Sequence, residues 1–407
     1  MTPTDHSTTD SVSDTTPADS DINSGTAPAH RPAHKSGPLT GLLVVALEQA
    51  VAAPLCTSRL QRAGARVIKI ERPEGDFARQ YDQAANGASS YFIWTNQGKE
   101  SLVLNIKDPT DQRLLSNLLS QADVLVQNLK PGALARAGFD PTTLNTMNPR
   151  LITCNISGYG NSEALKHMKA YDLLVQAETG LIATSGGPGA PGRIGISVCD
   201  IGAGVTAHAA ILEALIQRGI TNRGSSIDIS LFDVAAEWMS VPYVHARHGN
   251  GAPTRQGLQH PGIAPYGAYL TADNISTLVS IQNEREWVVF CRDVLQNEPL
   301  ATDSSFNTNT LRVKHRNALN TTIQSVLSTL TATQFRARLQ QADIAYAALN
   351  SVDDLVEHMA LRTETARDEN GHVVDLPAHP FATPPNSNAR LPSVGEHTDT
   401  IRQEFGS

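Results

Sequence analysis

Short apolar runs alternate with longer, helix-like segments along the first half of the chain, and this alternation constrains the fold more than any other feature of the sequence. Uninterrupted apolar runs suit strands that are buried on both faces of a sheet. Strands that alternate with helices at this spacing form βαβ units, so the pattern predicts an α/β fold with a parallel, doubly wound, Rossmann-like sheet. The predicted strands are 41–47, 66–70, 101–106, 122–127, 151–156 and 226–230.

Helices are predicted between these strands at 54–62, 171–179 and 201–218. Asp108 can cap a helix that follows the third strand, because its carboxylate can accept hydrogen bonds from the first free N–H groups. The stretch 185–192 holds too many glycines and prolines for regular structure, so we expect a loop there.

The pattern changes near residue 231, and the later part of the chain is typical of a smaller α+β domain. We expect irregular chain after residue 358. The predicted elements are helices at 231–247, 284–296, 311–330, 334–341 and 352–358, and a hairpin of strands 266–271 and 277–282 around residues 272–274.

Composition divides the chain further. The N-terminal stretch is rich in Thr, Ser, Asp and Pro and almost lacks large apolar residues, so it cannot bury enough surface to offset its ordering entropy. We therefore expect disorder there and assign no chemistry to His6, His30 or His34. The predicted divisions are a tail at 1–37, the first part of a large Rossmann-like domain at 38–230, a small α+β domain at 231–330, and a return to the large domain at 331–407.

Charge and cysteine usage narrow the class of protein. The 407 residues carry a formal net charge of -8 at pH 7, which argues against nonspecific binding to nucleic acid because such binding needs a basic surface. The four cysteines fit no zinc or redox motif, so we expect reduced thiols, no metal site and a cytoplasmic location. We also expect no membrane partner, because no apolar run approaches the roughly 20 residues that span a bilayer.

One motif points toward a different class of enzyme. Gly202-x-Gly204-x-x-Ala207, with Asp228 further on, is similar to a dinucleotide-binding fingerprint. A nicotinamide site needs these glycines in the first turn of the sheet, whereas here they follow several predicted strands. The small residues are better explained by close packing of a helix.

Several short blocks occur in one order and spacing, and together they are more specific than any one of them. Over about residues 38 to 405 the chain resembles the superfamily of class III CoA-transferases and 2-methylacyl-CoA racemases, which includes formyl-CoA and carnitine CoA-transferases. The blocks are Pro38-Leu39-x-Gly41, Gly64-Ala65-x-Val67-Ile68-Lys69-Ile70-Glu71-Arg72, Leu104-Asn105-Ile106-Lys107, Ala122-Asp123-Val124-x-Val126-x-Asn128, Ile156-Ser157-Gly158-Tyr159-Gly160, Lys169-Ala170-Tyr171-Asp172, Val198-Cys199-Asp200-Ile201-Gly202 and Gly395-Glu396-His397-Thr398.

The resemblance implies an assembly and a nucleophile. The assembly would be an interlocked homodimer of two ring-shaped chains, with CoA near the boundary between the domains. The nucleophile would be Asp200, which attacks a thioester and then carries CoA as an aspartyl thioester; this is covalent catalysis by a carboxylate. We expect Asp200 to stay charged, because a helix beginning near Ile201 would favour a negative charge at its N-terminus. Without the resemblance, Asp200 would be read as the cap of that helix.

The resemblance also implies where CoA binds. Acyl-CoA would be a substrate together with small carboxylic acids, and no cofactor would be bound permanently. Arginine and lysine at such positions suit the phosphates of CoA, since arginine can bind phosphate through two hydrogen bonds. The positions that would contact CoA are Val51, Ala52, Arg72, Leu104, Lys107, Asn128, Lys130, Arg136, Met168, Lys169 and Tyr171.

Two alternatives remain open, a racemase and an acyl-CoA-binding protein without activity. Racemases of this superfamily place a histidine directly before an aspartate, and here Tyr171 precedes Asp172. A tyrosine, whose reference pKa is about 10, exchanges protons poorly at pH 7, so the substitution favours transfer. The intact block around Asp200 argues against a protein without activity. Asp172 itself either hydrogen-bonds within the site or caps a helix.

The expected substrates are small branched dicarboxylates of four or five carbons. Val51 replaces the glutamine expected of formyl-CoA transferases, and 260–267 replaces their glycine-rich loop, which makes oxalate a doubtful acceptor. The resemblance is nearest to mesaconyl-CoA C1–C4 transferase. By position alone, Arg193, Arg255 and His260 are candidates for binding a second carboxylate.

Overall fold

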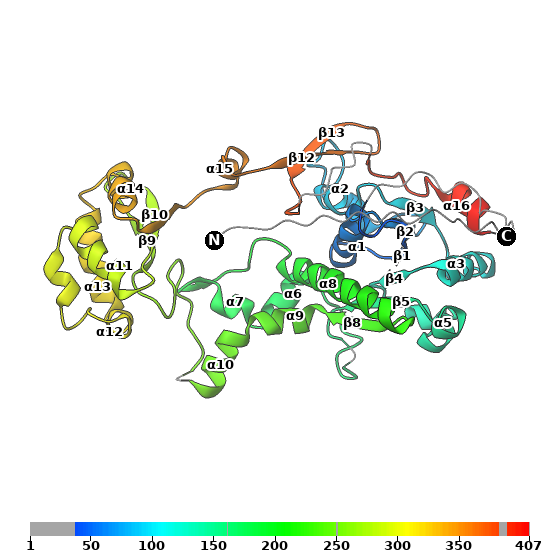
Figure 1. Ribbon diagram of the computed structural model, residues 1–407, viewed down its shortest axis with the longest axis horizontal. Coiled ribbons are helices and arrows are strands. Elements are labelled where there is room, and N and C mark those ends of the chain that lie inside the picture. Colours follow the sequence, from blue (N-terminus) through cyan, green and yellow to red (C-terminus); the bar gives the residue numbers. More distant parts are fainter. Residues whose placement is uncertain (1–36, 161, 250, 382–388, 407) are drawn as a thin grey trace, which may run out of the picture. The chain divides into compact units, whose positions relative to one another are not determined.

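A six-stranded parallel sheet forms the framework of the chain (Figure 1). The computed structural model describes residues 37–160, 162–249, 251–381 and 389–406, so the predicted tail at 1–37 lies outside this part except for Gly37. The parallel sheet confirms the prediction from the alternating pattern. In their order across the sheet, the strands are β3 (Glu100–Val103), β2 (Arg66–Glu71), β1 (Leu43–Leu47), β4 (Val124–Gln127), β5 (Ile152–Ser157) and β8 (Ser226–Ser230).

Most helices around the six-stranded sheet follow one of its strands, as predicted. Asp108 caps one of them, because its carboxylate accepts hydrogen bonds from the N–H groups of Thr110 and Asp111. The helices are α1 (Ala52–Arg62), α2 (Ser90–Asn96), α3 (Pro109–Gln121), α4 (Ala133–Arg136), α5 (Pro141–Met147), α6 (Asp172–Glu178), α7 (Leu181–Thr184), α8 (Val198–Thr221), α9 (Leu231–Trp238), α10 (Ser240–His248), α15 (Val352–Val356), α16 (Thr398–Phe405) and the 3-10 helix η1 (Phe77–Gln80).

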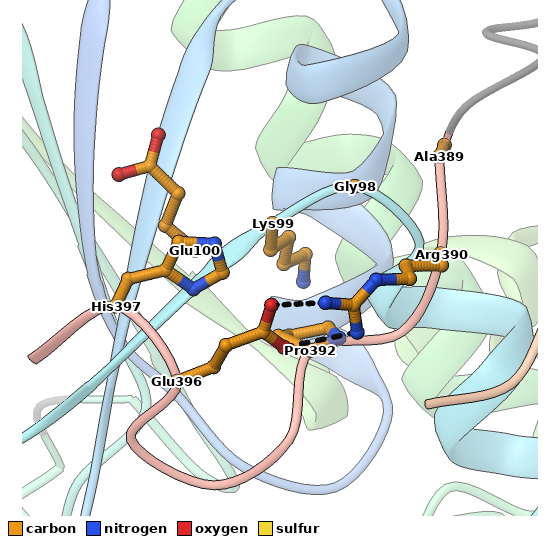
Figure 2. Close-up of a pocket in the computed structure, with 8 residues that line it drawn as sticks. All are labelled: Gly98, Lys99, Glu100, Ala389, Arg390, Pro392, Glu396 and His397. Atoms are coloured by element: carbon orange, nitrogen blue, oxygen red, sulfur yellow. Dashed lines mark hydrogen bonds and ion pairs between the residues drawn. The ribbon is translucent and has the colours of Figure 1, made fainter. Parts of the chain in front are cut away.

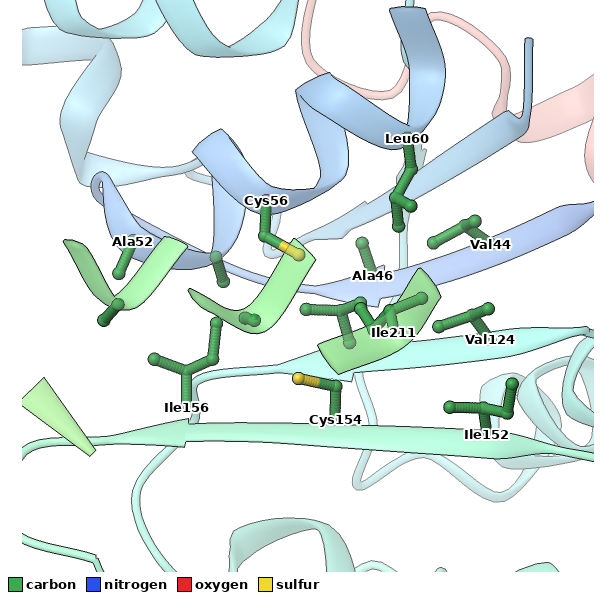
Figure 3. Packing of buried hydrophobic residues seen from close by; sticks show 14 of the residues in the cluster. Val44, Ala46, Ala52, Cys56, Leu60, Val124, Ile152, Cys154, Ile156 and Ile211 are labelled. Carbon is green, nitrogen blue, oxygen red and sulfur yellow. The ribbon is translucent and has the colours of Figure 1, made fainter. Parts of the chain in front are cut away.

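The central strand β1 is buried on both faces, as its uninterrupted apolar run predicts. Val44 and Ala46 lie in a core shared with α1 and α8, where Figure 3 shows Cys56 and Ile211 packing above the strands. Val45 lies in a second core on the opposite face, which is covered by α3 and α16. Because each face of the sheet has its own helical layer, the strands present only their ends to a ligand.

The glycine motif at 202–207 lies inside α8 and serves packing. A Cβ added at Gly204 would lie 2.5 Å from the carbonyl oxygen of Ala52, so only glycine lets α8 approach the start of α1 this closely. By length and composition α8 could cross a membrane, which the sequence analysis did not anticipate. Its face with Ala203, Ala207 and Ile211 is nevertheless buried, as in the core helix of a globular domain.

A third core is built around a separate, three-stranded antiparallel sheet. The predicted hairpin is confirmed, and a third strand pairs with it after residue 344. Phe335 and Leu339 also lie in this core, so the boundary predicted at 330 falls inside it. The elements are β9 (Tyr266–Leu270), β10 (Ser276–Ser280), β11 (Ala345–Ala348), α11 (Glu284–Val289), α12 (Asn309–Lys314), α13 (Arg316–Leu327) and α14 (Ala332–Gln341), with a π-helix at Phe290–Val294 and a 3-10 helix at Glu298–Thr302.

Three local predictions were wrong. The helix expected at 231–247 is broken at Met239 into α9 and α10, because Pro242 lacks the N–H group that would bond to the carbonyl of Trp238. The loop expected at 185–192 contains a small hairpin. The chain after 358 is partly regular, since it contains a hairpin and α16. These hairpins consist of β6 (Gly186–Gly187) with β7 (Ala190–Pro191), and β12 (Thr363–Arg367) with β13 (Val373–Pro377).

Candidate functional site

The loops that we predicted to bind a ligand lie at the carboxyl end of the sheet. The order of the strands reverses between β1 and β4, and ligands of open α/β sheets bind where such a reversal occurs. The backbone N–H of Gln49, just after β1, donates to Oδ1 of Asn128 at 2.9 Å. Nδ2 of Asn128, just after β4, donates back to the carbonyl of Gln49 at 2.8 Å. Two hydrogen bonds therefore join the loops at the point of reversal.

The predicted CoA-binding residues that follow the first four strands share this edge, because the strands are parallel neighbours. Val51, Ala52 and Leu104 are buried, whereas the basic side chains are exposed to solvent. Exposed cations beside a switch point suit the phosphates of a nucleotide. The residues brought to this edge are Val51 and Ala52 after β1, Arg72 after β2, Leu104 and Lys107 after β3, and Asn128, Lys130 and Arg136 after β4.

Asp200 lies in the first turn of α8 and is partly buried. The predicted start near Ile201 was therefore too late, and Asp200 belongs to the helix. The helix is capped by a different carboxylate: Oδ1 of Asp172 accepts hydrogen bonds from the N–H groups of Cys199 at 2.7 Å and Asp200 at 3.3 Å. Nε2 of Gln176 donates to Oδ2 of Asp172 at 2.7 Å. Asp172 thus does cap a helix, and that helix is the one that carries Asp200.

The electrostatics of Asp200 differ from the expectation that it stays fully charged. Burial, together with the negative charge of Asp172, raises the pKa of Asp200 to about 7. The expected help from the helix terminus goes to Asp172 instead, because its carboxylate accepts hydrogen bonds from two N–H groups of the first turn of α8. A carboxylate of raised pKa is partly protonated at pH 7, and its ionised form is a stronger nucleophile than an ordinary aspartate.

The remaining predicted residues, Met168, Lys169 and Tyr171, are exposed and immediately precede Asp172. The structure adds Tyr81, which the sequence analysis missed. Burial and the negative charges of Asp76 and Asp200 raise the pKa of Tyr81 to about 12. Tyr81 belongs to none of the quoted blocks, so only the fold could reveal it.

The candidates for a second carboxylate make local contacts. The guanidinium of Arg193 donates to the carbonyls of Ile194 and Gly195, the latter at 3.0 Å. Nε of Arg255 donates to the carbonyl of Gly187 at 3.2 Å. The ring of His260 stacks on Tyr266, with 5.2 Å between the ring centroids. These contacts do not link any of the three side chains to Asp200.

A small pocket of about 320 Å³ lies at the amino end of β3, the opposite end from Asp200 (Figure 2). Figure 2 shows the ion pair of Arg390 with Glu396 at this pocket. The nearby backbone N–H of Ser101 donates to Nδ1 of His397 at 3.2 Å, and that of Val103 donates to Oγ1 of Thr398 at 3.1 Å. The block at 395–398 therefore covers the free edge of the sheet along β3.

A Rossmann-type sheet with exposed cations at its switch point is typical of proteins that bind a nucleotide-bearing ligand. Residues 39–398 match the model of CoA-transferase family III. The chain belongs to this family and is a CoA-transferase.

Relatives and a solved structure agree with this assignment. Acetyl-CoA:oxalate CoA-transferase of Acetobacter aceti is 33% identical over 92% of this chain and 98% of its own length. Succinyl-CoA:mesaconate CoA-transferase of Haloarcula hispanica is 28% identical over 91% of this chain and 97% of its own. A crystal structure of a CaiB/BaiF family protein from Brucella suis is 29% identical, with a TM-score of 0.77, and covers 91% of this chain and 100% of that one.

Proposed function

We propose that the enzyme moves CoA between small dicarboxylic acids, with C4–C5 branched acids such as mesaconate as its substrates, through an aspartyl-CoA thioester on Asp200. The observation that carries the proposal is the partly buried carboxylate of Asp200, which Asp172 holds in place through the first turn of α8. The names of the relatives, which include an oxalate and a mesaconate CoA-transferase, support a dicarboxylate acceptor. The oxalate relative weakens the argument that the sequence made against oxalate.

The reaction proceeds as two exchanges at carbonyl carbons. An oxygen of Asp200 attacks the thioester carbon of the donor, the C–S bond breaks, and a mixed anhydride and CoA thiolate form. The thiolate then attacks the Asp200 carbonyl carbon, which releases the donor carboxylate and leaves aspartyl-CoA. The acceptor carboxylate reverses both steps and leaves as the new acyl-CoA. Each step exchanges a carboxylate for a thiolate, so no net hydrolysis occurs and no ATP is consumed.

The covalent intermediate provides the direct test. We expect the enzyme, incubated with succinyl-CoA and then trapped with hydroxylamine or borohydride, to carry its modification on the peptide that contains Asp200, as read by mass spectrometry. A label on another peptide, or no label under conditions in which CoA is transferred, would contradict the mechanism. Exchange of the α-proton in deuterated water without an acceptor acid would favour a racemase instead, although Tyr171 occupies the position of the racemase histidine.

We propose that two copies form an interlocked homodimer. Within the described chain, α10 and α15 contain no buried residue. Val241 and Tyr243 on α10 are 68% and 63% exposed, and Val352 on α15 is 78% exposed. Such apolar surface is typical of a face that another chain covers.

We also propose a cytoplasmic location, which agrees with four buried free thiols, and acyl-CoA and carboxylic acids as the partners.

The dimer has a measurable signature. Two interlocked rings cannot separate without unfolding, so we expect sedimentation to show a dimer that persists on dilution to nanomolar concentrations. A folded monomer that appears on dilution would contradict the interlocked arrangement.

A further inference from the structure

Four charged side chains are buried together beneath the loop that follows β1. The side chains of Glu48, Lys69, Asp76 and Lys99 have 0% of their surface exposed. Nζ of Lys69 lies 2.8 Å from Oδ2 of Asp76 and 3.6 Å from Oε1 of Glu48, and Nζ of Lys99 lies 2.6 Å from the same Oε1. Two acids and two bases therefore neutralise one another in the interior.

Asp76 connects this cluster to two backbone segments. Its Oδ2 binds Lys69, while its Oδ1 accepts hydrogen bonds from the N–H groups of Ala50 at 3.2 Å and Ala78 at 2.9 Å. Ala50 belongs to the loop after β1, and Ala78 belongs to η1, which leads directly to Tyr81. A single carboxylate thus binds both the loop after β1 and the first turn of η1.

The loop after β1 needs such a support. Ala50 has a φ of +65°, in the left-handed region that costs a residue with a side chain about 1 kcal/mol. Asp76 holds its N–H group, and Asn128 holds both polar backbone groups of Gln49. The loop then enters α1, where the carbonyl of Ala52 faces Gly204, one turn after Asp200. Residue 50 lies two positions before α1, so its conformation sets where the start of α1 lies against α8, the helix that carries Asp200.

Stability alone does not explain why the chain has charged rather than apolar side chains at these buried positions. A buried ion pair is often no more stable than apolar side chains of the same volume, because both charges lose their hydration. Apolar side chains, however, could not accept the N–H group of Ala50. The distinguishing property of Asp76 is therefore that its carboxylate accepts the N–H group of Ala50. Lys69 beside it offsets the cost of burying that negative charge.

We propose that Asp76, neutralised by Lys69, is a positioning residue of the CoA-transferase reaction, which holds residues 48–51 in the conformation that seats the acyl-CoA next to Asp200. The proposal rests on the proposed function, because it assumes that the loop contacts acyl-CoA. Asp76 acts through Ala50 and through the loop, not by touching the reacting atoms.

Two double variants separate positioning from stability. Asp76→Asn with Lys69→Met removes both charges but keeps an oxygen that can accept from Ala50, whereas Asp76→Ala with Lys69→Met removes the acceptor as well. Neither leaves an unpaired buried charge, since Glu48 keeps Lys99 as its partner. We expect the second variant to melt at a lower temperature than the first, because the N–H groups of Ala50 and Ala78 lose their acceptor. We expect a kcat/KM for succinyl-CoA within about threefold of wild type for the first variant and a loss of about 30-fold for the second, because small misplacements of bound groups are costly. We also expect calorimetry to show weaker binding of CoA to the second variant.

A control and two outcomes make the test decisive. Glu284→Gln removes the partner of the buried Arg312 in the separate core around β9 and β10, and we expect it to lower the melting temperature without changing kcat/KM. Equal kcat/KM and equal CoA affinity in the two double variants would overturn the positioning role. If the wild type transfers no CoA between acids but the alanine variant still binds CoA more weakly, the proposed function fails and the positioning role stands.

Discussion

We expect the Asp200→Asn variant to lose CoA transfer and yet to be more stable than the wild type at pH 8. Asparagine has nearly the same shape, but its amide cannot attack a thioester, so we expect the rate of transfer from succinyl-CoA to mesaconate, followed by chromatography of the CoA esters, to fall at least about 1,000-fold. The stability change follows from the raised pKa of Asp200, since asparagine mimics the protonated acid that the buried site prefers.

The sign of the stability change is set by linkage. The folded pKa of Asp200 is about 7, whereas an unfolded aspartate titrates near pH 4, so the folded state of the wild type binds more protons between these values. The wild type therefore loses stability as pH rises from about 4 to about 7, by at most about 4 kcal/mol. The asparagine variant has no such titration, so its advantage in melting temperature should grow between pH 5 and pH 8.

A matched substitution tests whether the effect belongs to this site. Asp140 also lies at the start of a helix, where it caps α5 through the N–H groups of Thr142 and Thr143. We expect Asp140→Asn to leave transfer unchanged, and also the pH dependence of stability between pH 5 and pH 8. Hydrogen bonds from Thr143 and Thr142 lower the pKa of Asp140, so it stays ionised over this range, and asparagine caps helices as well as aspartate does. If Asp200→Asn were instead less stable than the wild type at pH 8, Asp200 would serve mainly as a structural residue.

The sequence predicts the framework well because burial leaves a periodic signal. The apolar run of β1 and the alternation of strands and helices follow from which faces are covered, and both were confirmed. The position of the predicted CoA-binding residues at one edge follows from the parallel sheet alone. The late hairpin of β12 and β13 was missed because only one of its residues, Ala366, is fully buried, so its apolar signal is weak.

The polar interior could not be predicted in the same way, because its members come from distant parts of the chain. Lys69 and Glu71 stand within the apolar strand β2, which signals two buried charges but not their partners. Asp76 and Glu48 become partners of Lys69 only when the loops after β1 and β2 meet. Asp172 likewise lies 28 positions before Asp200, and its capping role depends on how α6 packs against α8.

The capping role of Asp172 leads to the second large effect, a displaced pH profile. We expect kcat/KM for transfer to rise with pH through a midpoint near 7 in the wild type, because only ionised Asp200 attacks the thioester. Tyr81 and Cys199 do not contribute to this limb, since burial raises the pKa of each to about 12. The lower limb therefore reports the carboxylate of Asp200.

Asp172→Asn should move that midpoint to lower pH by on the order of one unit, because the variant removes the negative charge that opposes ionisation of Asp200. The asparagine oxygen can still accept from Cys199 and Asp200, so α8 keeps its cap, although the hydrogen bond from Gln176 is lost. Ionisation of the CoA phosphates affects wild type and variant alike and cancels in the comparison. Glu178→Gln changes an exposed residue of α6, the helix that begins at Asp172, and should leave the midpoint in place. An unchanged or raised midpoint in Asp172→Asn would mean that desolvation alone, without the second carboxylate, sets the acidity of the nucleophile.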